Sequence, residues 1–187
     1  MTDARLPAAV RLVFGFSDCA LKERLSARLA ADYGRWLGGF RTLERRAGAA
    51  RDGFDVEALG GGRETLASRS IVSAEAFNKY GLNPAALERV ALPALEAASA
   101  AGKILLFDEL GPMAARSARF SAKAVELLFS GAPCLVFYRR GAAAFEDAFG
   151  RMADTAILEL SAETWAEAVA ASRAWLDYKV RLMENGR

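Results

Sequence analysis

The stretch Val10 to Ala30, VRLVFGFSDCALKERLSARLA, decides how this chain is organised. Its first part, Arg11 to Phe16, is a short apolar run of the kind that forms a buried strand. Ser17 or Asp18 can then cap a helix. The apolar positions of that helix recur at helical spacing: Leu21, Leu25, Leu29 and Tyr33. Its other face is charged and carries Lys22, Glu23, Arg24 and Arg28. Gly34 is expected to end the helix. The stretch therefore predicts a strand, a short turn and an amphipathic helix.

The same order of elements carries the phosphate-binding loop G-x-x-x-x-G-K-[ST] in many proteins. Gly15 fits its first glycine, but Ala20, Leu21 and Lys22 stand where the motif has glycine, lysine and a hydroxyl residue. The second glycine lets backbone amides curl around phosphate, the lysine neutralises phosphate charge, and the hydroxyl completes a magnesium shell. Asp18 adds a negative charge where phosphates would lie. The turn is thus either an eroded nucleotide site or one that never held a nucleotide.

The composition is that of a folded protein with a substantial core. The chain has 187 residues, 53% of them hydrophobic and 26% charged, which suits a single domain. Its net charge of +2 gives no electrostatic basis for binding nucleic acid or a membrane. The absence of histidine disfavours zinc catalysis and serine–histidine or cysteine–histidine chemistry. Two cysteines make no disulfide scaffold, no signal peptide is visible, and no apolar run approaches the roughly 20 residues that span a bilayer, so we expect a cytoplasmic protein.

The rest of the chain alternates between strand and helix patterns. Strands are predicted at 36–42, 103–107, 134–138 and 155–160, a β-hairpin at 54–70, and helices from Asn83-Pro84, at 117–129, at 143–152 and from a Ser161 cap onward. Pro93 predicts a kink or break in the second helix. Arg41, Arg45, Arg46 and Arg51 are expected to form a basic loop near the carboxyl ends of the strands, which either recognises an anion or a partner or is simply solvated.

This alternation predicts a three-layer α/β fold with a mainly parallel sheet. We expect one domain over residues 1–187, with the hairpin at about 53–70 as an antiparallel insertion. Ligands of such sheets bind at the carboxyl ends of the strands. The residues expected on that rim are 15–22, Asp108 and Glu109, and Arg139 and Arg140.

Three further stretches carry a resemblance to a known family. They are GGF-x-T-x9-DGF at Gly38 to Phe54, YGLN with ALPALEAA within Tyr80 to Ala98, and FDEL-G-PM-x3-S-x2-F at Phe107 to Phe120. In this order, behind a strand, turn and helix, they resemble the small P-loop proteins of the cancer-related nucleoside-triphosphatase family. The resemblance runs from about Val10 to Trp175.

The resemblance implies a RecA-like P-loop fold and magnesium-dependent hydrolysis of ATP, GTP and other nucleoside triphosphates to the diphosphate. It implies that Asp108 holds magnesium as the Walker B aspartate and that Glu109 orients and deprotonates the attacking water. Gly15 matches the opening glycine of the loop, whereas Ala114 stands where the family has a glutamate. With Arg139 as a substitute for the missing lysine, the candidate phosphate-binding residues are Gly15, Phe16, Ser17, Asp18, Cys19, Ala20, Leu21, Lys22 and Arg139.

We interpret the chain as a family member with an eroded phosphate loop, impaired or lost hydrolysis, and a binding or regulatory role toward an anionic small molecule or a protein partner. One alternative is an active magnesium-dependent nucleoside-triphosphatase with an unorthodox loop, in which Glu109 is the base and Lys22 or Arg139 contacts phosphate. In one version the loop is a residue longer, Lys22 is the loop lysine and Glu23 takes the hydroxyl position. A second alternative is a structural subunit. Magnesium and ATP or GTP are the expected cofactors if the site works, and none otherwise.

Simpler structural interpretations also exist for each candidate. The acidic pair can be a solvated strand end, and Arg139 with Arg140 an exposed basic turn. Leu21 falls on the apolar stripe of its helix and is expected in the core.

Overall fold

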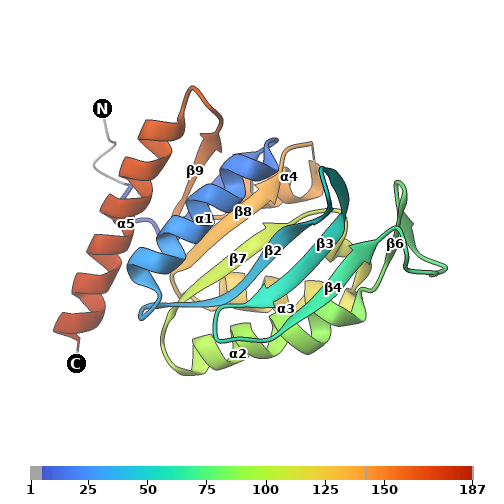
Figure 1. Cartoon of the computed structure of the whole chain (residues 1–187). Coiled ribbons are helices and arrows are strands. Elements are labelled where there is room, and N and C mark those ends of the chain that lie inside the picture. Colours follow the sequence, from blue (N-terminus) through green and yellow to red (C-terminus); the bar gives the residue numbers. More distant parts are fainter. Residues whose placement is uncertain (1–5, 142, 187) are drawn as a thin grey trace.

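The computed structural model describes residues 6–141 and 143–186, and its strands form one mixed sheet. The sheet has the order β5-β6-β4-β3-β2-β7-β8-β1-β9 (Figure 1). The strands are β1 (Arg11–Phe16), β2 (Leu37–Ala47), β3 (Ala50–Ala58), β4 (Arg63–Ser68), β5 (Ala76–Phe77), β6 (Tyr80–Leu82), β7 (Ile104–Leu110), β8 (Cys134–Arg139) and β9 (Thr155–Leu160). The α-helices are α1 (Cys19–Tyr33), α2 (Leu92–Ala100), α3 (Ala118–Phe129), α4 (Ala143–Arg151) and α5 (Trp165–Asn185).

The sheet has a parallel half and an antiparallel half. Neighbouring strands run parallel from β2 through β7, β8 and β1 to β9, and antiparallel from β2 through β3, β4 and β6 to β5. Every residue of β1 is buried because helices cover both faces of the parallel half. The predicted α/β architecture is confirmed, with an antiparallel part larger than the hairpin at 53–70.

The basic loop expected after the second strand is wrong. Arg41, Arg45 and Arg46 belong to β2 and Arg51 to β3, and the turn between these strands is confined to residues 48–49. Acids of the two strands pair with two of these arginines across the ladder: Arg51 with Glu44 at 3.2 Å and Arg45 with Asp55 at 3.7 Å. This pairing extends the antiparallel half toward the rim of the sheet.

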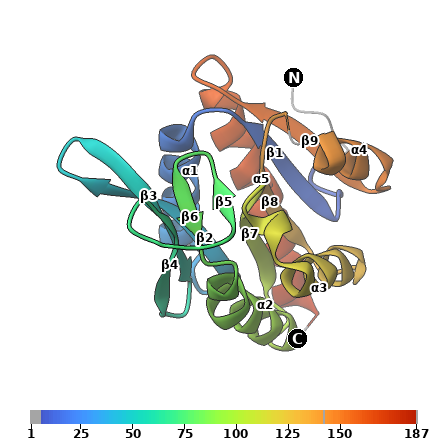
Figure 2. The ribbon, with the colours of Figure 1, turned by 90° about the vertical axis from the view of Figure 1, so that its right-hand side faces the viewer.

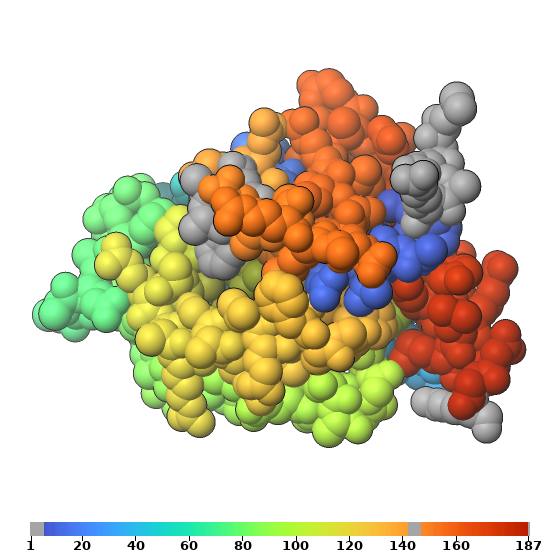
Figure 3. Space-filling view, turned by 180° about the vertical axis from the view of Figure 1, so that it is seen from behind, coloured from blue at the N-terminus to red at the C-terminus, as the bar shows by residue number. Residues whose placement is uncertain are grey.

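Two core clusters lie on opposite faces of the sheet. Helices α1 and α5 cover one face, where Leu25, Leu29 and Trp175 are fully buried (Figure 2). Helices α2 and α3 cover the other face, where Phe40 packs edge-on against Phe120 at 5.5 Å between ring centroids. Seen from behind, α3 in yellow and α4 in orange lie over this second face (Figure 3). The arrangement is the predicted three-layer one.

Several predicted boundaries shift. The second helix opens with a π-helical segment, Leu87–Ala91, and becomes α-helical at Leu92, so the irregularity expected from Pro93 lies just before that proline. Helix α5 begins at Trp165 after Thr164, so Ser161 caps the turn that precedes the helix: its hydroxyl accepts the Thr164 N–H at 3.3 Å, and its own N–H donates to the Thr164 hydroxyl at 2.9 Å. Over residues 6–141 and 143–186, none of the helices combines the length and apolarity that crossing a membrane requires.

Candidate functional site

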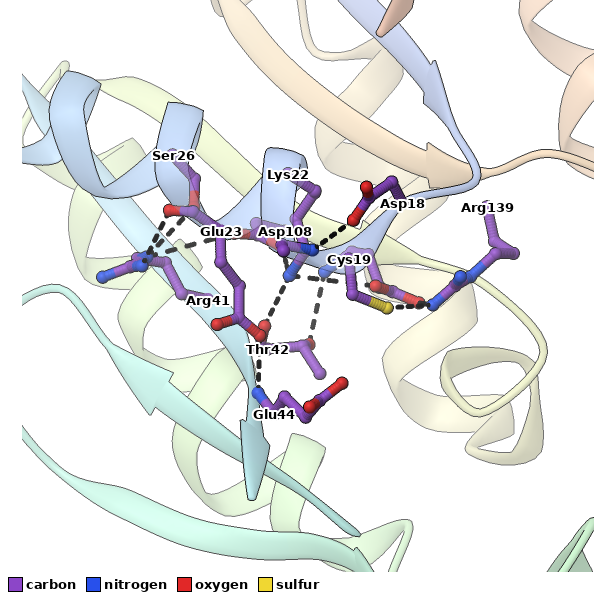
Figure 4. A network of polar contacts seen from close by, with 12 residues as sticks. Asp18, Cys19, Lys22, Glu23, Ser26, Arg41, Thr42, Glu44, Asp108 and Arg139 are labelled. Carbon is purple, nitrogen blue, oxygen red and sulfur yellow. Dashed lines mark hydrogen bonds and ion pairs between the residues drawn. The ribbon is translucent and has the colours of Figure 1, made fainter. Parts of the chain in front are cut away.

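The carboxyl ends of β1, β7 and β8 bring the candidate residues together on one rim (Figure 4). In the parallel register Gly15 lies beside Tyr138, and Phe16 beside Arg139. Asp108 lies beside Phe137 on the next strand. Arg140 belongs elsewhere, since its guanidinium pairs with Glu159 of the edge strand β9.

The connection between β1 and α1 consists of Ser17 and Asp18 only. The Asp18 carboxylate accepts hydrogen bonds from the backbone N–H groups of Ala20 at 2.7 Å and Leu21 at 3.3 Å. These amides are the ones a helix start offers to an anion. The anion that they bind in this structure is the side chain of Asp18 itself.

The other residues of this turn are held by packing and by Arg139. A Cβ atom on Gly15 would lie 2.7 Å from the Tyr138 hydroxyl oxygen, so the tyrosine ring closes over this glycine. The Arg139 guanidinium donates to the Ser17 carbonyl at 3.1 Å and to the Cys19 sulfur at 2.9 Å. Phe16 is fully buried, whereas Leu21, which was expected in the core, is only partly buried at the margin of the α1–α5 cluster because the buried face of α1 begins at Lys22.

Lys22 is buried, contrary to its predicted place on the polar face of α1. Its side chain is 1% exposed, and its ammonium lies 2.5 Å from Asp108 Oδ1 and 2.5 Å from the Thr42 carbonyl oxygen. Burial alone would lower the pKa of Lys22, but the charges of Asp108 and Glu109 and the hydrogen bond to Asp108 raise it above its ordinary value. Lys22 is therefore a buried ammonium ion.

Asp108 is fully buried inside β7 and is not the solvated end of a strand. Besides Lys22, the Arg41 guanidinium lies beside it, with Nε 4.0 Å from Asp108 Oδ2. Arg41 is oriented by Ser26, whose hydroxyl accepts a hydrogen bond from Nε at 3.2 Å. Two cations of the chain thus face one buried carboxylate.

Glu109 is 6% exposed and sits at a bulge in the pairing of β7 with β8. Its backbone N–H donates to the Thr42 hydroxyl at 3.3 Å. Its carboxylate lies 3.8 Å from the Lys22 ammonium and 3.7 Å from an Arg139 nitrogen. Burial raises the pKa of Glu109, and the positive charges of Lys22 and Arg139 oppose that rise.

A cleft of about 230 Å³ opens beside Glu109 and Arg139. Its walls come from both halves of the sheet, because the antiparallel strands contribute aromatic rings and a second arginine. The lining residues are Arg51, Phe54, Phe77, Asn78, Tyr80, Glu109, Pro112, Met113 and Arg139. A larger cavity of about 540 Å³ lies at the opposite ends of the central strands, between the β3–β4 turn and α2. It is lined mainly by glycine, alanine and other apolar residues. We place the candidate site at the smaller cleft because the charged groups face it.

The rim does not fit a magnesium ion as it stands. Mg²⁺ takes near-octahedral oxygen ligands, and a cation held by Asp108 Oδ1 would lie where the Lys22 ammonium is. Within the described part of the chain, no cluster of three or more aspartate, glutamate, cysteine or histidine side chains is arranged to hold a metal.

Sequence reasoning missed Thr42 as a site residue, and it placed Arg41 and Arg51 in a loop near this rim instead of in strands. Thr42 does occur in the quoted stretch GGF-x-T, but nothing local assigned it a contact. The burial of Lys22 had a signal, because Leu25, Ser26 and Leu29 follow it at helical spacing and all three are buried. A buried stripe that begins at Lys22 instead of Leu21 corresponds to the face of α1 that is buried in the structure.

Comparisons with known proteins agree with the fold and with the family resemblance. The family model described as NTPase matches residues 19–171. Nucleoside-triphosphatase THEP1 from Thermococcus kodakarensis is 37% identical over 126 residues, which cover 64% of this chain and 70% of that protein.

Two solved structures share the fold. The crystal structure of THEP1 from Aquifex aeolicus superposes with a TM-score of 0.75 at 22% identity, covering 82% of this chain and 91% of that one. The solution structure of a human cancer-related nucleoside triphosphatase superposes with a TM-score of 0.64 at 23% identity, covering 95% and 99%. Because the family model matches well over half of its residues, this chain belongs to the NTPase family of nucleoside-triphosphatases.

Proposed function

We propose that this protein is a nucleoside-triphosphatase-family member with an eroded phosphate loop, and that it acts by binding an anionic small molecule in the cleft beside Glu109 and Arg139. The observation that carries the proposal is the capping of α1 by Asp18 across a connection of two residues. A triphosphate needs those amides and a loop that curls around it. In this chain a carboxylate already fills the amides and would repel phosphate.

The cationic groups support the same proposal. The Lys22 ammonium is 1% exposed and faces Asp108, so it does not point toward a ligand arriving from solvent. This geometry also disfavours the version of the loop in which Lys22 is the phosphate lysine and Glu23 takes the hydroxyl position, since the Glu23 carboxylate accepts the Glu44 N–H at 2.6 Å.

The cleft offers a different anion site. Arg51 and Arg139 lie at it with side chains 43% and 27% exposed, and guanidinium groups bind phosphate and carboxylate in pairs of hydrogen bonds. Phe54 and Tyr80 supply an apolar wall that suits a ring or hydrocarbon part of the ligand. We therefore expect a phosphorylated or carboxylated small molecule and a binding or regulatory role.

Nucleotide binding is the first measurement. We expect ATP and GTP, with or without Mg²⁺, to leave the melting temperature unchanged and no phosphate to be released. Inorganic phosphate and pyrophosphate are the probes for the cleft; a ligand of the native state raises the melting temperature. Arg139→Gln should abolish that rise. Arg140→Gln is the matched control because Arg140 pairs with Glu159 outside the cleft. ATP binding that requires Mg²⁺ would contradict the proposal.

An active nucleoside-triphosphatase with an unorthodox loop is the second candidate. One observation favours it: Glu109 is nearly buried, its pKa is raised, and it faces the cleft beside Arg139, as a general base would. This function requires phosphate release that disappears in Glu109→Gln and persists in Arg140→Gln.

A further inference from the structure

The charges around Asp108 are balanced entirely by side chains of this chain. Lys22, Arg41 and Arg139 supply three positive charges. Asp108 and Glu109 supply two negative charges, and Glu23, which acts on Lys22 through its charge, supplies a third. The group is neutral without any added ion.

The position of the Lys22 ammonium is that of a bound cation. It lies 2.5 Å from a carboxylate oxygen of Asp108, 2.5 Å from the Thr42 carbonyl oxygen and 3.8 Å from Glu109 Oε2. Oxygens from three residues on two strands therefore surround one positive nitrogen, as Figure 4 shows for Asp108 and Thr42. Carboxylate and carbonyl oxygens are also the ligands that divalent cations such as Mg²⁺ take.

We propose that the ammonium of Lys22 is a tethered cation that takes the place of a divalent metal at Asp108. The protein then binds no Mg²⁺ or Mn²⁺ at this position, and removal of the ammonium opens a divalent-cation site formed by Asp108, Glu109 and the Thr42 carbonyl. Glu109 also lines the cleft, but the cation site is centred on the buried Asp108 and is measured by Mn²⁺, so its test is separate from that of the anion ligand proposed above.

Burial is what keeps the ammonium in this position. The side chains of Lys22, Asp108 and Glu109 are 1%, 0% and 6% exposed, so water cannot take over the contacts if Lys22 swings away. Breaking a buried pair leaves an uncompensated charge in a medium of low polarity, which is strongly unfavourable. A metal ion approaching Asp108 would meet a positive charge that has no better place to go.

Replacing the lysine by the serine of the phosphate-loop motif tests the proposal. Lys22→Ser leaves the group with one excess negative charge around a space that the ammonium vacated. Mn²⁺ is the probe, followed by electron paramagnetic resonance and by the melting temperature at constant ionic strength. We expect one Mn²⁺ per chain to bind Lys22→Ser about tenfold or more tightly than it binds the wild type, because the opposing charge is gone.

The controls separate this site from general effects. Lys22→Ser/Asp108→Asn keeps the space but loses the carboxylate, and it should bind Mn²⁺ no better than the wild type. Lys123→Ala removes an exposed lysine that pairs with Glu126, and it should leave Mn²⁺ binding unchanged. Arg139→Gln, which tests the cleft, removes a positive charge 3.7 Å from Glu109, so it should not weaken the Mn²⁺ response of Lys22→Ser.

Two results would overturn the proposal. One is a wild-type protein that binds Mn²⁺ in a way that Asp108→Asn abolishes. The other is a Lys22→Ser variant that is folded by circular dichroism yet binds Mn²⁺ no better than the wild type. If Lys22→Ser does not fold without metal, refolding decides: Mn²⁺ should restore the native spectrum and NaCl of equal ionic strength should not, and failure of Mn²⁺ counts against the proposal.

Discussion

At the scale of single residues, the site is shaped by where each charged atom can find a partner. Lys22 faces inward because its ammonium pairs there with the buried carboxylate of Asp108. The Glu109 carboxylate lies beside the cleft and makes only long ion pairs, with Lys22 and Arg139. Packing alone favours glycine at position 15, since a Cβ atom there would lie 2.7 Å from the Tyr138 hydroxyl oxygen and the ring would have to shift. A residue that matches a functional motif can therefore be present for a structural cause.

The raised pKa of Glu109 predicts a pH dependence of stability. A carboxyl whose pKa is higher in the folded state contributes stability below its unfolded pKa, near 4.5, and loses that contribution as pH rises through the folded pKa. The glutamine of Glu109→Gln does not ionise. The unfolding free energy of this variant should therefore rise relative to that of the wild type as pH increases from about 4 to about 8. Urea unfolding across this range measures the difference.

Glu64 supplies a control of opposite sign. The hydrogen bond from Arg89 lowers the pKa of Glu64, so its contribution is present above the unfolded pKa and is lost as pH falls. Glu64→Gln should lose ground to the wild type as pH rises toward 4.5, which is below most of the window in which Glu109→Gln gains, and should change little above it. Parallel profiles for the two variants would be inconsistent with a buried Glu109.

Gly15→Ala tests whether packing explains this glycine. A Cβ atom would lie 2.7 Å from the Tyr138 hydroxyl oxygen and 2.9 Å from ring carbon Cζ, and such overpacking costs about 1–3 kcal/mol of unfolding free energy. Gly150→Ala is the control, because its Cβ meets open space in α4 and should gain about 0.5–1 kcal/mol. Chemical denaturation measures both. An unchanged stability in Gly15→Ala would remove the packing explanation.

At the scale of elements, the decisive feature is the short connection between β1 and α1. It ends the strand at Phe16 and starts the helix at Cys19, and Asp18 satisfies the first free amides of the helix. A longer, glycine-bearing loop is what wraps a phosphate in related folds. In this chain the connection of two residues leaves room at the start of α1 for one carboxylate only, that of Asp18.

Asp18 both caps α1 and occupies the N–H groups that could bind an anion, and substitutions at Asp18 separate these two effects. Asp18→Ala removes the cap and should lower the unfolding free energy by about 1 kcal/mol, whereas Asp18→Ser keeps a capping oxygen and should lose much less. Asp18→Ala also exposes the N–H groups of Ala20 and Leu21 to anions. Sulfate should therefore stabilise Asp18→Ala more than it stabilises the wild type in thermal unfolding. Equal sulfate effects in both proteins would show that these amides do not form an anion site.

At the scale of the whole molecule, two core clusters share one sheet. Leu12 and Phe14 of β1 face the α1–α5 cluster, while Val13 between them faces the α2–α3 cluster. Each central strand thus contributes to both cores, and neither face can lose its packing without affecting the other. The cleft depends on this union, because Arg139 comes from the parallel half and Arg51 from the antiparallel half.

Unfolding in urea should be a single cooperative transition, as expected for one domain over residues 1–187. All three tryptophans, Trp36, Trp165 and Trp175, lie in or against the α1–α5 cluster. Tryptophan fluorescence therefore reports one face, and far-UV circular dichroism reports the whole fold. The two curves should share one midpoint. A fluorescence change that precedes the loss of helix signal would indicate two separately folding parts.

The sequence by itself determined the alternation of strands and helices, the start of α3 near Ser117, the buried β1, β7 and β8, and the rim on which the candidate residues meet. These features follow from hydrophobic periodicity and helix-start residues, which depend on the local sequence, and from the parallel connections between strands, which depend only on the order of the elements. The tertiary structure decided that Lys22 faces inward, that the arginines of the expected loop lie in strands, and that Arg51 joins Arg139 at the cleft. The physical reason is that a charged side chain beside an apolar stripe can face either water or a buried partner. Burial is favourable only where folding brings an opposite charge from a distant segment, as β7 brings Asp108 to Lys22.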